Sequence, residues 1–248
     1  MPITITLHHI PSLLNELPLA EARQLLSREE STSAGNIKAE RRLHEFIYGR
    51  YTLKQALAKH LNQPVQRIDL KKAQHGKLYI QGNPTHFNLT HSGEYLAYLI
   101  CNQGPVGIDI EHPQRPIRDF MHIAERYFTA QESKALHLSA NEQTQRALFY
   151  KIWTLKEAAL KTVGAGISAG LERLDASAMN LDKPQTLRLA DSCHSLWFDY
   201  WHHPLGINGV YLSAALEATE WATQSARTET GSVHTVGYTK PQFHLAIE

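Results

Sequence analysis

Two acidic side chains, Asp109 and Glu111, have the spacing of a metal-binding pair. They lie in the stretch 106–111, Val-Gly-Ile-Asp-Ile-Glu, whose apolar residues alternate with the others as on a β-strand. The apolar side chains would enter a core, and both carboxylates would project from the opposite face beside the small Gly107. Carboxylates about 7 Å apart repel each other and suit a hard cation such as Mg²⁺. A strand with a solvated polar face would show the same alternation, so this stretch alone leaves both interpretations open.

The segment 141–163 predicts a long helix that carries a third acid and a lysine. Glu157 and Lys161 are four residues apart and therefore share one helix face. Laid against the carboxylate strand, this helix would bring Glu157 beside the two acids, and Lys161, one turn further, could meet a phosphate group. An exposed ion pair between the two side chains, with a stabilisation of about 0.2–0.5 kcal/mol, would account for the same spacing.

Positive charge is concentrated between Lys38 and Lys77. This segment has ten lysines and arginines against three acids, an excess of seven, whereas the formal net charge of the whole chain is +1. Such a concentration predicts a site for an anion that carries several phosphates. A solvated basic helix face would have the same composition and is the alternative.

The composition is that of a globular protein. Of 248 residues, 42% are hydrophobic and 20% are charged, which allows one large domain or two small ones. The small net charge indicates neither nucleic acid nor membrane as a partner. Cys101 and Cys193 form no CxxC motif and are expected to be free thiols. We see no signal peptide and no stretch of the roughly 18 apolar residues that a membrane span needs, so we expect a cytoplasmic protein.

Hydrophobic periodicity and turn residues predict an alternation of helices and short strands. The helices are expected at 18–30, 37–61, 117–127, 129–138 and 141–163. The strands are expected at 3–7, 67–70, 77–80, 85–89, 95–101, 106–111, 186–189, 195–201 and 210–216. We expect a loop at 31–36, a turn at 90–93 and a hairpin made by the strands 95–101 and 106–111. The segment 243–247 could pack on the rest.

The order of these elements predicts an α+β fold with two pseudo-symmetric lobes, because a long helix followed by short antiparallel strands occurs twice. Each lobe would have its long helix packed on a small sheet. The first lobe, 1–104, would be the basic one. The second lobe, 105–248, would carry the acids and the helix 141–163, with the carboxylate strand near the seam between the lobes.

Two signatures of the chain resemble those of the 4′-phosphopantetheinyl transferase superfamily. The first is Gly107-Ile-Asp-Ile-Glu111, and the second, about forty residues later, is Trp153-Thr-Leu-Lys-Glu-Ala-Ala-Leu-Lys161. The stretch Phe87-Asn-Leu-Thr-His-Ser-Gly93 is similar to the Asn-x-Ser-His-Ser motif of the large, two-lobed (Sfp-type) class. Arg126-Tyr-Phe128 with Glu132 resembles the segment usual between the two signatures.

Gly164-Ala-Gly-Ile-Ser168 resembles the glycine loop that follows the second signature. The resemblance covers roughly residues 36 to 168. The first thirty residues, and everything after Ser168, match only in length and element order. The length is similar to the two-lobed class, which implies a monomer, and differs from the short class that forms trimers.

The resemblance implies an enzyme that moves the 4′-phosphopantetheine arm of coenzyme A to a serine of an apo carrier protein and releases adenosine 3′,5′-bisphosphate. Asp109, Glu111 and Glu157 would hold Mg²⁺, and Glu157 would also be the general base, directly or through a metal-bound water. Lys161 would pair with the pyrophosphate. His91 would donate a hydrogen bond to a phosphate of coenzyme A from the expected turn 90–93. Coenzyme A and the carrier protein would be the partners.

The resemblance also implies contacts with the nucleotide. Arg41 or Arg42 would bind the nucleotide, and the sequence leaves open which. Lys77 would touch the nucleotide, although Leu78 replaces the proline that usually follows this lysine. Thr90 stands where the family usually has serine and keeps a hydroxyl group.

The sequence also gives expectations for residues that take no direct part in the reaction. Trp153 is expected in the core, and Lys156, which points about 100° away from Glu157, is expected to play a structural role. Arg28 is the basic candidate near the position of the family's earlier lysines. The carrier docking surface is expected around Phe120, Met121, Ile123 and Ala124. The pathway, whether fatty-acid, polyketide or nonribosomal-peptide, is open.

Two other functions would account for part of this pattern. A different Mg²⁺-dependent phosphoryl-transfer enzyme would explain Asp109 and Glu111, but not the stretch 87–93 together with the helix 141–163. A non-catalytic module that binds carrier proteins would not be expected to keep three potential metal ligands.

Overall fold

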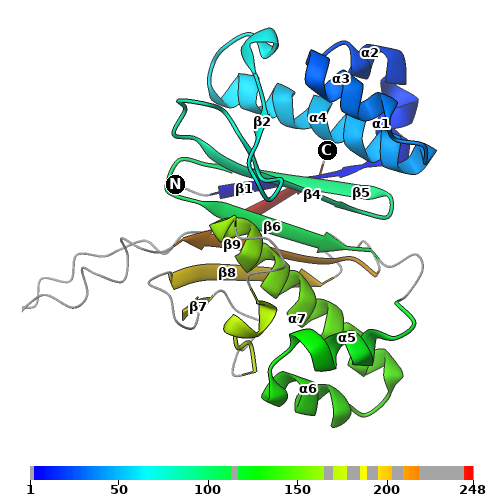
Figure 1. The fold of residues 1–248 in the computed structure, drawn as a ribbon, viewed down its shortest axis with the longest axis vertical. Coiled ribbons are helices and arrows are strands. Elements are labelled where there is room, and N and C mark those ends of the chain that lie inside the picture. The colour runs from blue at the N-terminus through cyan, green and yellow to red at the C-terminus, as the bar shows by residue number, and fades with distance from the viewer. Residues whose placement is uncertain are drawn as a thin grey trace, which may run out of the picture.

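The computed structural model describes residues 3–112, 117–164, 170–177, 185–188, 195–202, 209–217 and 243–247. Two four-stranded sheets lie next to each other between two groups of helices (Figure 1). The strand orders are β10-β1-β5-β4 and β6-β9-β8-β7. This mixture of helices and small, mostly antiparallel sheets confirms the predicted α+β class. The pseudo-symmetry of two lobes stays a prediction.

The first sheet is built almost entirely from the N-terminal part of the chain. Its strands are β1 (Ile3–His9), β4 (His86–Ser92), β5 (Tyr95–Cys101) and β10 (Phe243–Ile247). The helices beside it are α1 (Ile10–Glu16), α2 (Leu19–Arg23), α3 (Arg28–Gly35) and α4 (Glu40–His60). A 3₁₀ turn (Val65–Arg67) and the two-stranded ribbon of β2 (Lys71–Lys72) and β3 (Leu78–Tyr79) connect α4 to β4. Strand β10 pairs with β1 in parallel, so the segment 243–247 returns to this first sheet.

The second sheet is antiparallel and comes from the C-terminal part of the chain. Its strands are β6 (Val106–Glu111), β7 (Gln185–Arg188), β8 (Ser195–His202) and β9 (Tyr211–Glu217). The helices are α5 (Phe120–Tyr127), α6 (Ala130–His137) and α7 (Glu142–Val163), followed by a 3₁₀ turn (Leu171–Arg173). Within the part of the chain described, no helix combines the length and apolarity that a membrane crossing requires.

One apolar core joins the two sheets. The inward side chains of β1, β5, β6 and β9 form it, including Ile5, Leu99, Ile108 and Leu212. The predicted alternation of β6 is confirmed, because its apolar residues enter this core and leave Asp109 on the other face. That other face meets α7, so the core fixes which side chains of β6 approach the helix.

Helix α7 begins and ends where the sequence predicts. The Asn141 side chain accepts a hydrogen bond from the backbone of Thr144, and Gly164 ends the helix in the left-handed conformation with φ 69°. The capping box of Thr129 and Glu132 is also present at the start of α6. These local signals suffice to predict the helix ends, because each cap joins groups only three or four residues apart.

The predicted helix 18–30 and loop 31–36 are wrong. The chain instead forms α2 and then α3, which runs to Gly35. Ser27 begins α3 because its hydroxyl accepts from the Glu30 backbone while the Glu30 carboxylate accepts from the Ser27 backbone. This reciprocal cap starts a new helix within the segment 18–30, for which the sequence pattern predicts a single helix.

The predicted turn 90–93 and the predicted hairpin are also wrong. Strand β4 continues to Ser92, and the turn begins at Gly93, which has φ 62°. Strand β5 pairs with β1 on one edge and β4 on the other, so it has no edge left for β6. Strand β6 pairs with β9 instead.

Gly107 allows α7 to approach β6 closely. A Cβ atom at this position would lie 2.1 Å from the Ala158 carbonyl oxygen and 2.5 Å from the Thr162 nitrogen. Both are backbone atoms, which cannot move aside as a flexible side chain can. Glycine is therefore required here for packing, and the close approach brings Glu157 and Lys161 onto the carboxylate face of β6.

We predict that Gly107→Ala lowers the free energy of unfolding by about 3 kcal/mol or more, the upper end for overpacking, because the clash is with backbone. Chemical denaturation of both proteins measures the difference. The matched control is Gly35→Ala at the end of α3, where an added Cβ meets nothing within 4 Å. Alanine is a better helix former than glycine, so the control should be neutral or slightly stabilising. Equal effects of the two substitutions would contradict the packing argument.

Candidate active site at the seam between the sheets

Side chains of β4 hold the free edge of β6. The Asn88 Oδ1 accepts a hydrogen bond from the Ile108 backbone nitrogen at 2.9 Å, and the Ser92 hydroxyl oxygen accepts from the His112 nitrogen at 3.1 Å. Asn88 and Ser92 are four residues apart along β4, an even spacing, so they lie on one side of the strand. They join the two sheets across a seam, which the sequence reading did not anticipate because it placed Ser92 in a turn.

Asp109 lies at the centre of this seam. Its side chain is 8% exposed, and its Oδ1 accepts from the Lys161 ammonium at 2.5 Å and from the Thr90 hydroxyl at 3.3 Å. The Lys161 ammonium also donates to the Thr90 hydroxyl at 3.1 Å. Burial raises the pKa of Asp109, and the charge of Lys161 opposes that shift. Thr90, between Asn88 and Ser92, thus belongs to the same set of bridging side chains.

The two other predicted carboxylates lie within electrostatic reach of Asp109. Burial raises the pKa of Glu111 to about 7, helped by the charges of Asp109 and Glu157 and opposed by a hydrogen bond from Ser92 at 2.8 Å. Burial also raises the pKa of Glu157 to about 7, again with help from the charge of Asp109 and against that of Lys161. The structure therefore gathers three acids that repel one another.

These acids have the donor chemistry for a hard cation. The buried Asp109 Oδ2 and Glu157 Oε1 have no hydrogen-bond partner. Carboxylate oxygens of this kind are what Mg²⁺ prefers. Among the residues described, however, no three acidic, histidine or cysteine side chains are already arranged as a metal site. The ammonium of Lys161 neutralises Asp109 in this arrangement, and the metal set Asp109, Glu111 and Glu157 stays a prediction.

His91 projects from the opposite side of β4, toward α4. Its Nδ1 lies 3.2 Å from Glu45 Oε2, and Arg41 Nε lies 3.4 Å from Glu45 Oε1. Burial lowers the pKa of His91 to about 4, reinforced by the charges of Lys161, Arg42 and Arg41. Burial raises the pKa of Glu45, and the two arginines oppose that shift. Sequence reasoning missed Glu45, although an acid four residues after Arg41 on a helix was the available signal.

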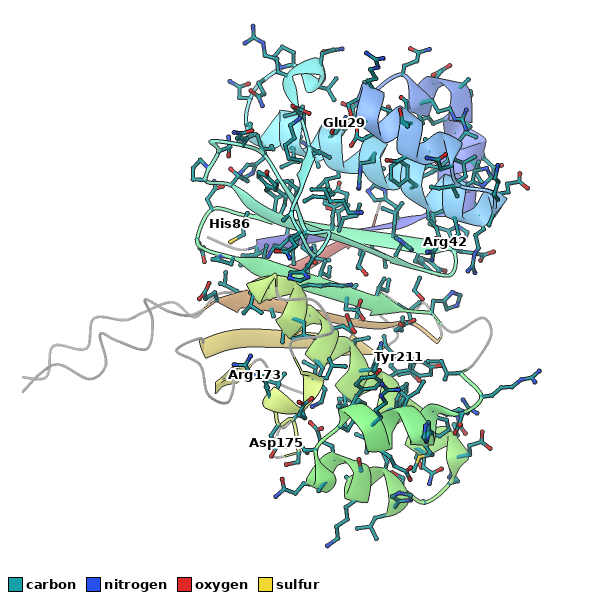
Figure 2. All side chains as sticks on the ribbon, viewed as in Figure 1. Glu29, Arg42, His86, Arg173, Asp175 and Tyr211 are labelled. Atoms are coloured by element: carbon teal, nitrogen blue, oxygen red, sulfur yellow. The ribbon has the colours of Figure 1, made fainter. Side chains whose placement is uncertain are left out.

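Beside His91 lies a basic cavity of about 320 Å³ between α4, β4 and the β2–β3 ribbon. Its positively charged lining residues are Arg42, Arg50, Lys72 and Lys77. Part of the basic segment 38–77 thus converges on one cavity. Arg42 lines this cavity, whereas Arg41 contacts Glu45. In Figure 2, Arg42 and His86 lie toward opposite ends of the first sheet.

Lys77 is placed differently from the expectation. Its stem lines the cavity, but its ammonium donates to the carbonyl oxygens of Val106, Lys161 and Thr162. Burial lowers the pKa of Lys77 to about 8. The contact of Lys77 with a nucleotide therefore stays a prediction.

The structural roles predicted on α7 are confirmed. Trp153 is partly buried and packs against the core, stacked on Phe149 with ring centroids 5.8 Å apart. The ammonium of Lys156 is fully buried and lies 2.9 Å from the Glu132 carboxylate. The docking surface expected around Phe120, Met121, Ile123 and Ala124 is wrong for Phe120 and Ala124, which are buried in the core cluster that Trp153 contacts.

Comparison with known proteins agrees with the motifs. The family model described as the 4′-phosphopantetheinyl transferase superfamily matches residues 105–215, which include β6, α7 and most of β9. Residues 105–215 are therefore similar to this superfamily. The matched segment contains Asp109, Glu111, Glu157 and Lys161, so the similarity and the gathering of acids concern the same part of the chain.

Relatives extend the similarity beyond this segment. The chain is 33% identical over 172 residues to the human L-aminoadipate-semialdehyde dehydrogenase-phosphopantetheinyl transferase, which covers 64% of the chain and 56% of that relative. It is 40% identical over 129 residues to the 4′-phosphopantetheinyl transferase psf-1 of Bacillus pumilus, covering 52% and 53%. The chain spans little more than half the length of these two transferases.

We predict that Glu157→Gln stabilises the metal-free protein above pH 7. The folded pKa of about 7 exceeds the ordinary value of 4.5, so stability from this group is present below pH 4.5 and is lost as pH rises through 7. Glutamine cannot ionise, and at pH 8 the variant should be more stable by about 1 kcal/mol after allowance for solvent screening.

Thermal unfolding in the presence of a chelator, between pH 4.5 and pH 8, measures this effect. Added Mg²⁺ should then raise the Tm of the wild-type protein and not that of the variant. The control is Glu21→Gln at an exposed position of α2, which should leave both responses unchanged. A variant that is less stable than the wild type at pH 8 would contradict the prediction.

Proposed function

We propose that this protein transfers the 4′-phosphopantetheine arm of coenzyme A to a serine of an apo carrier protein, with Mg²⁺, and releases adenosine 3′,5′-bisphosphate. The observation that carries the proposal is the two-sided use of β4. Thr90 faces Asp109 and Lys161, whereas His91 faces the basic cavity. One extended anion could therefore lie with its nucleotide on one side of this strand and its pyrophosphate on the other.

In the proposed reaction, the serine oxygen bonds to the phosphorus next to pantetheine, and the bond from that phosphorus to the bridging pyrophosphate oxygen breaks. Asp109, Glu111 and Glu157 would hold Mg²⁺, which supplies neutralisation of the pyrophosphate charge when it is bound. The ammonium of Lys161 adds a second positive charge at the same place.

Glu157 would accept the proton of the serine hydroxyl. A base works best when its pKa lies near the working pH, and burial raises the pKa of this carboxylate to about 7. Arg42 and His91 would bind the phosphates of the nucleotide portion, since both line the basic cavity. The leaving group then carries its charge into positively charged surroundings.

The proposed function is tested by mass spectrometry of an apo carrier protein after incubation with this protein, coenzyme A and Mg²⁺. We expect a mass gain of one phosphopantetheine group on serine, and loss of the gain when Mg²⁺ is chelated. Carriers from fatty-acid, polyketide and nonribosomal-peptide synthesis should be tried in turn. No gain on any of them would refute the proposal, and the Asp109→Ala variant is the negative control.

We predict that Arg42→Ala raises the KM for coenzyme A about tenfold and changes kcat little, because one charge-assisted hydrogen bond contributes about 1.5 kcal/mol or more. Steady-state kinetics with varied coenzyme A measure this. Arg23→Ala, at an exposed position of α2, is the matched control and should change neither constant. An unchanged KM for coenzyme A in Arg42→Ala would show that the nucleotide does not bind in this cavity.

A further inference from the structure

Lys77 connects the first half of the chain to the end of α7. It follows Gly76, which has φ 88°, in the turn before β3. Its ammonium donates to the carbonyl oxygen of Val106 at 3.0 Å and to those of Lys161 and Thr162 at 2.7 Å each. The partners are 29, 84 and 85 residues away in sequence, so this contact joins parts of the chain that are distant in sequence.

The carbonyl oxygens that Lys77 binds need a partner from outside their own elements. The last four carbonyls of a helix have no hydrogen-bond donor within the helix, and those of Lys161 and Thr162 belong to the last turn of α7. The Val106 carbonyl lies at the first residue of β6. A positive charge at a helix C-terminus is also favourable for the helix dipole.

The ammonium of Lys77 is fully used by these contacts. A lysine has three N–H donors, and three carbonyl oxygens lie within 3.0 Å. A nucleotide phosphate would have to compete with all three. The stem of Lys77, in contrast, lines the basic cavity, and its Cδ would lie 3.6 Å from a Cβ atom added at Gly164.

Both elements that Lys77 holds carry members of the proposed active site. Lys161 contributes its backbone carbonyl to Lys77 and its side chain to Asp109. Val106 lies three residues before Asp109 on the same strand. Loss of the Lys77 contacts would therefore free the end of α7 and the start of β6, and with them both partners of the Lys161–Asp109 ion pair.

We propose that Lys77 is a positioning residue: it fixes the end of α7 against the start of β6 and acts on the reaction through Lys161 and Asp109, not by contact with the nucleotide. This proposal rests on the proposed function. It assigns to Lys77 a role different from the nucleotide contact that the family resemblance implies.

The test compares Lys77→Met with Lys72→Met, a second lysine that lines the same cavity. Carrier modification gives kcat and the KM for coenzyme A. Hydrogen exchange, followed by mass spectrometry on the protein without ligands, reports the amides of residues 160–164 and 106–108. We expect Lys77→Met to lower kcat at least tenfold, to change KM less than twofold and to speed exchange in both segments at least tenfold.

Lys72→Met should instead alter KM and leave exchange in both segments unchanged. Lys77→Arg, which keeps a positive charge and several donors, should restore part of both kcat and the protection from exchange. If Lys77→Met does not fold, Lys77→Gln replaces it, since an amide retains two N–H donors.

Two results would overturn the proposal. A KM raised tenfold with kcat and exchange unchanged would make Lys77 a nucleotide contact. Faster exchange with kcat unchanged would make it a structural brace without influence on the reaction. The exchange measurement needs no activity, so if the wild-type protein transfers nothing, the proposed function fails while the contact of Lys77 with α7 is still decided.

Discussion

The free edge of β6 is held by side chains and not by a neighbouring strand. Edge N–H and C=O groups need partners when they are buried, and here Asn88, Ser92 and Lys77 provide them. Direct pairing of β4 with β6 would set the strands about 4.8 Å apart and merge the sheets. Bridging by side chains spaces the strands more widely. That spacing leaves room for Thr90, Asp109 and the end of Lys161 between the two sheets.

The same seam concentrates acids that do not stabilise the fold by themselves. Burial raises the pKa of Asp109, Glu111 and Glu157, and the charge of Asp109 raises the pKa of the two glutamates further. Groups arranged against stability are typical of functional sites, where their unfavourable energy is offset elsewhere. In this chain, burial of the apolar core shared by the two sheets offsets this unfavourable energy. The same core fixes the face of β6 that meets α7. Lys161 supplies a positive charge to Asp109.

Sequence patterns predicted the parts of the site that depend on near neighbours. The alternation of β6 and the caps at Asn141 and Gly164 are local, and the structure has all of them. The stretch 90–93 was misread because Thr, Ser and Gly favour turns, whereas pairing with β5 keeps Thr90 to Ser92 in a strand. The use of the Lys77 ammonium could not be predicted, since its partners on α7 are 84 and 85 residues away.

Strand β4 imposes a constraint of register on the whole site. Thr90 and His91 are consecutive, so they face opposite sides, one toward Asp109 and the other toward the basic cavity. A slip of one residue would exchange the two sides and separate the acids from Thr90. Asn88 and Ser92 oppose such a slip, because they accept hydrogen bonds from the backbone nitrogens of Ile108 in β6 and of His112 just after it. Donors and acceptors are both four residues apart, so the two bonds form only in this register. The bridging hydrogen bonds therefore do more than close the seam, since they also fix which side chain faces each half of the site.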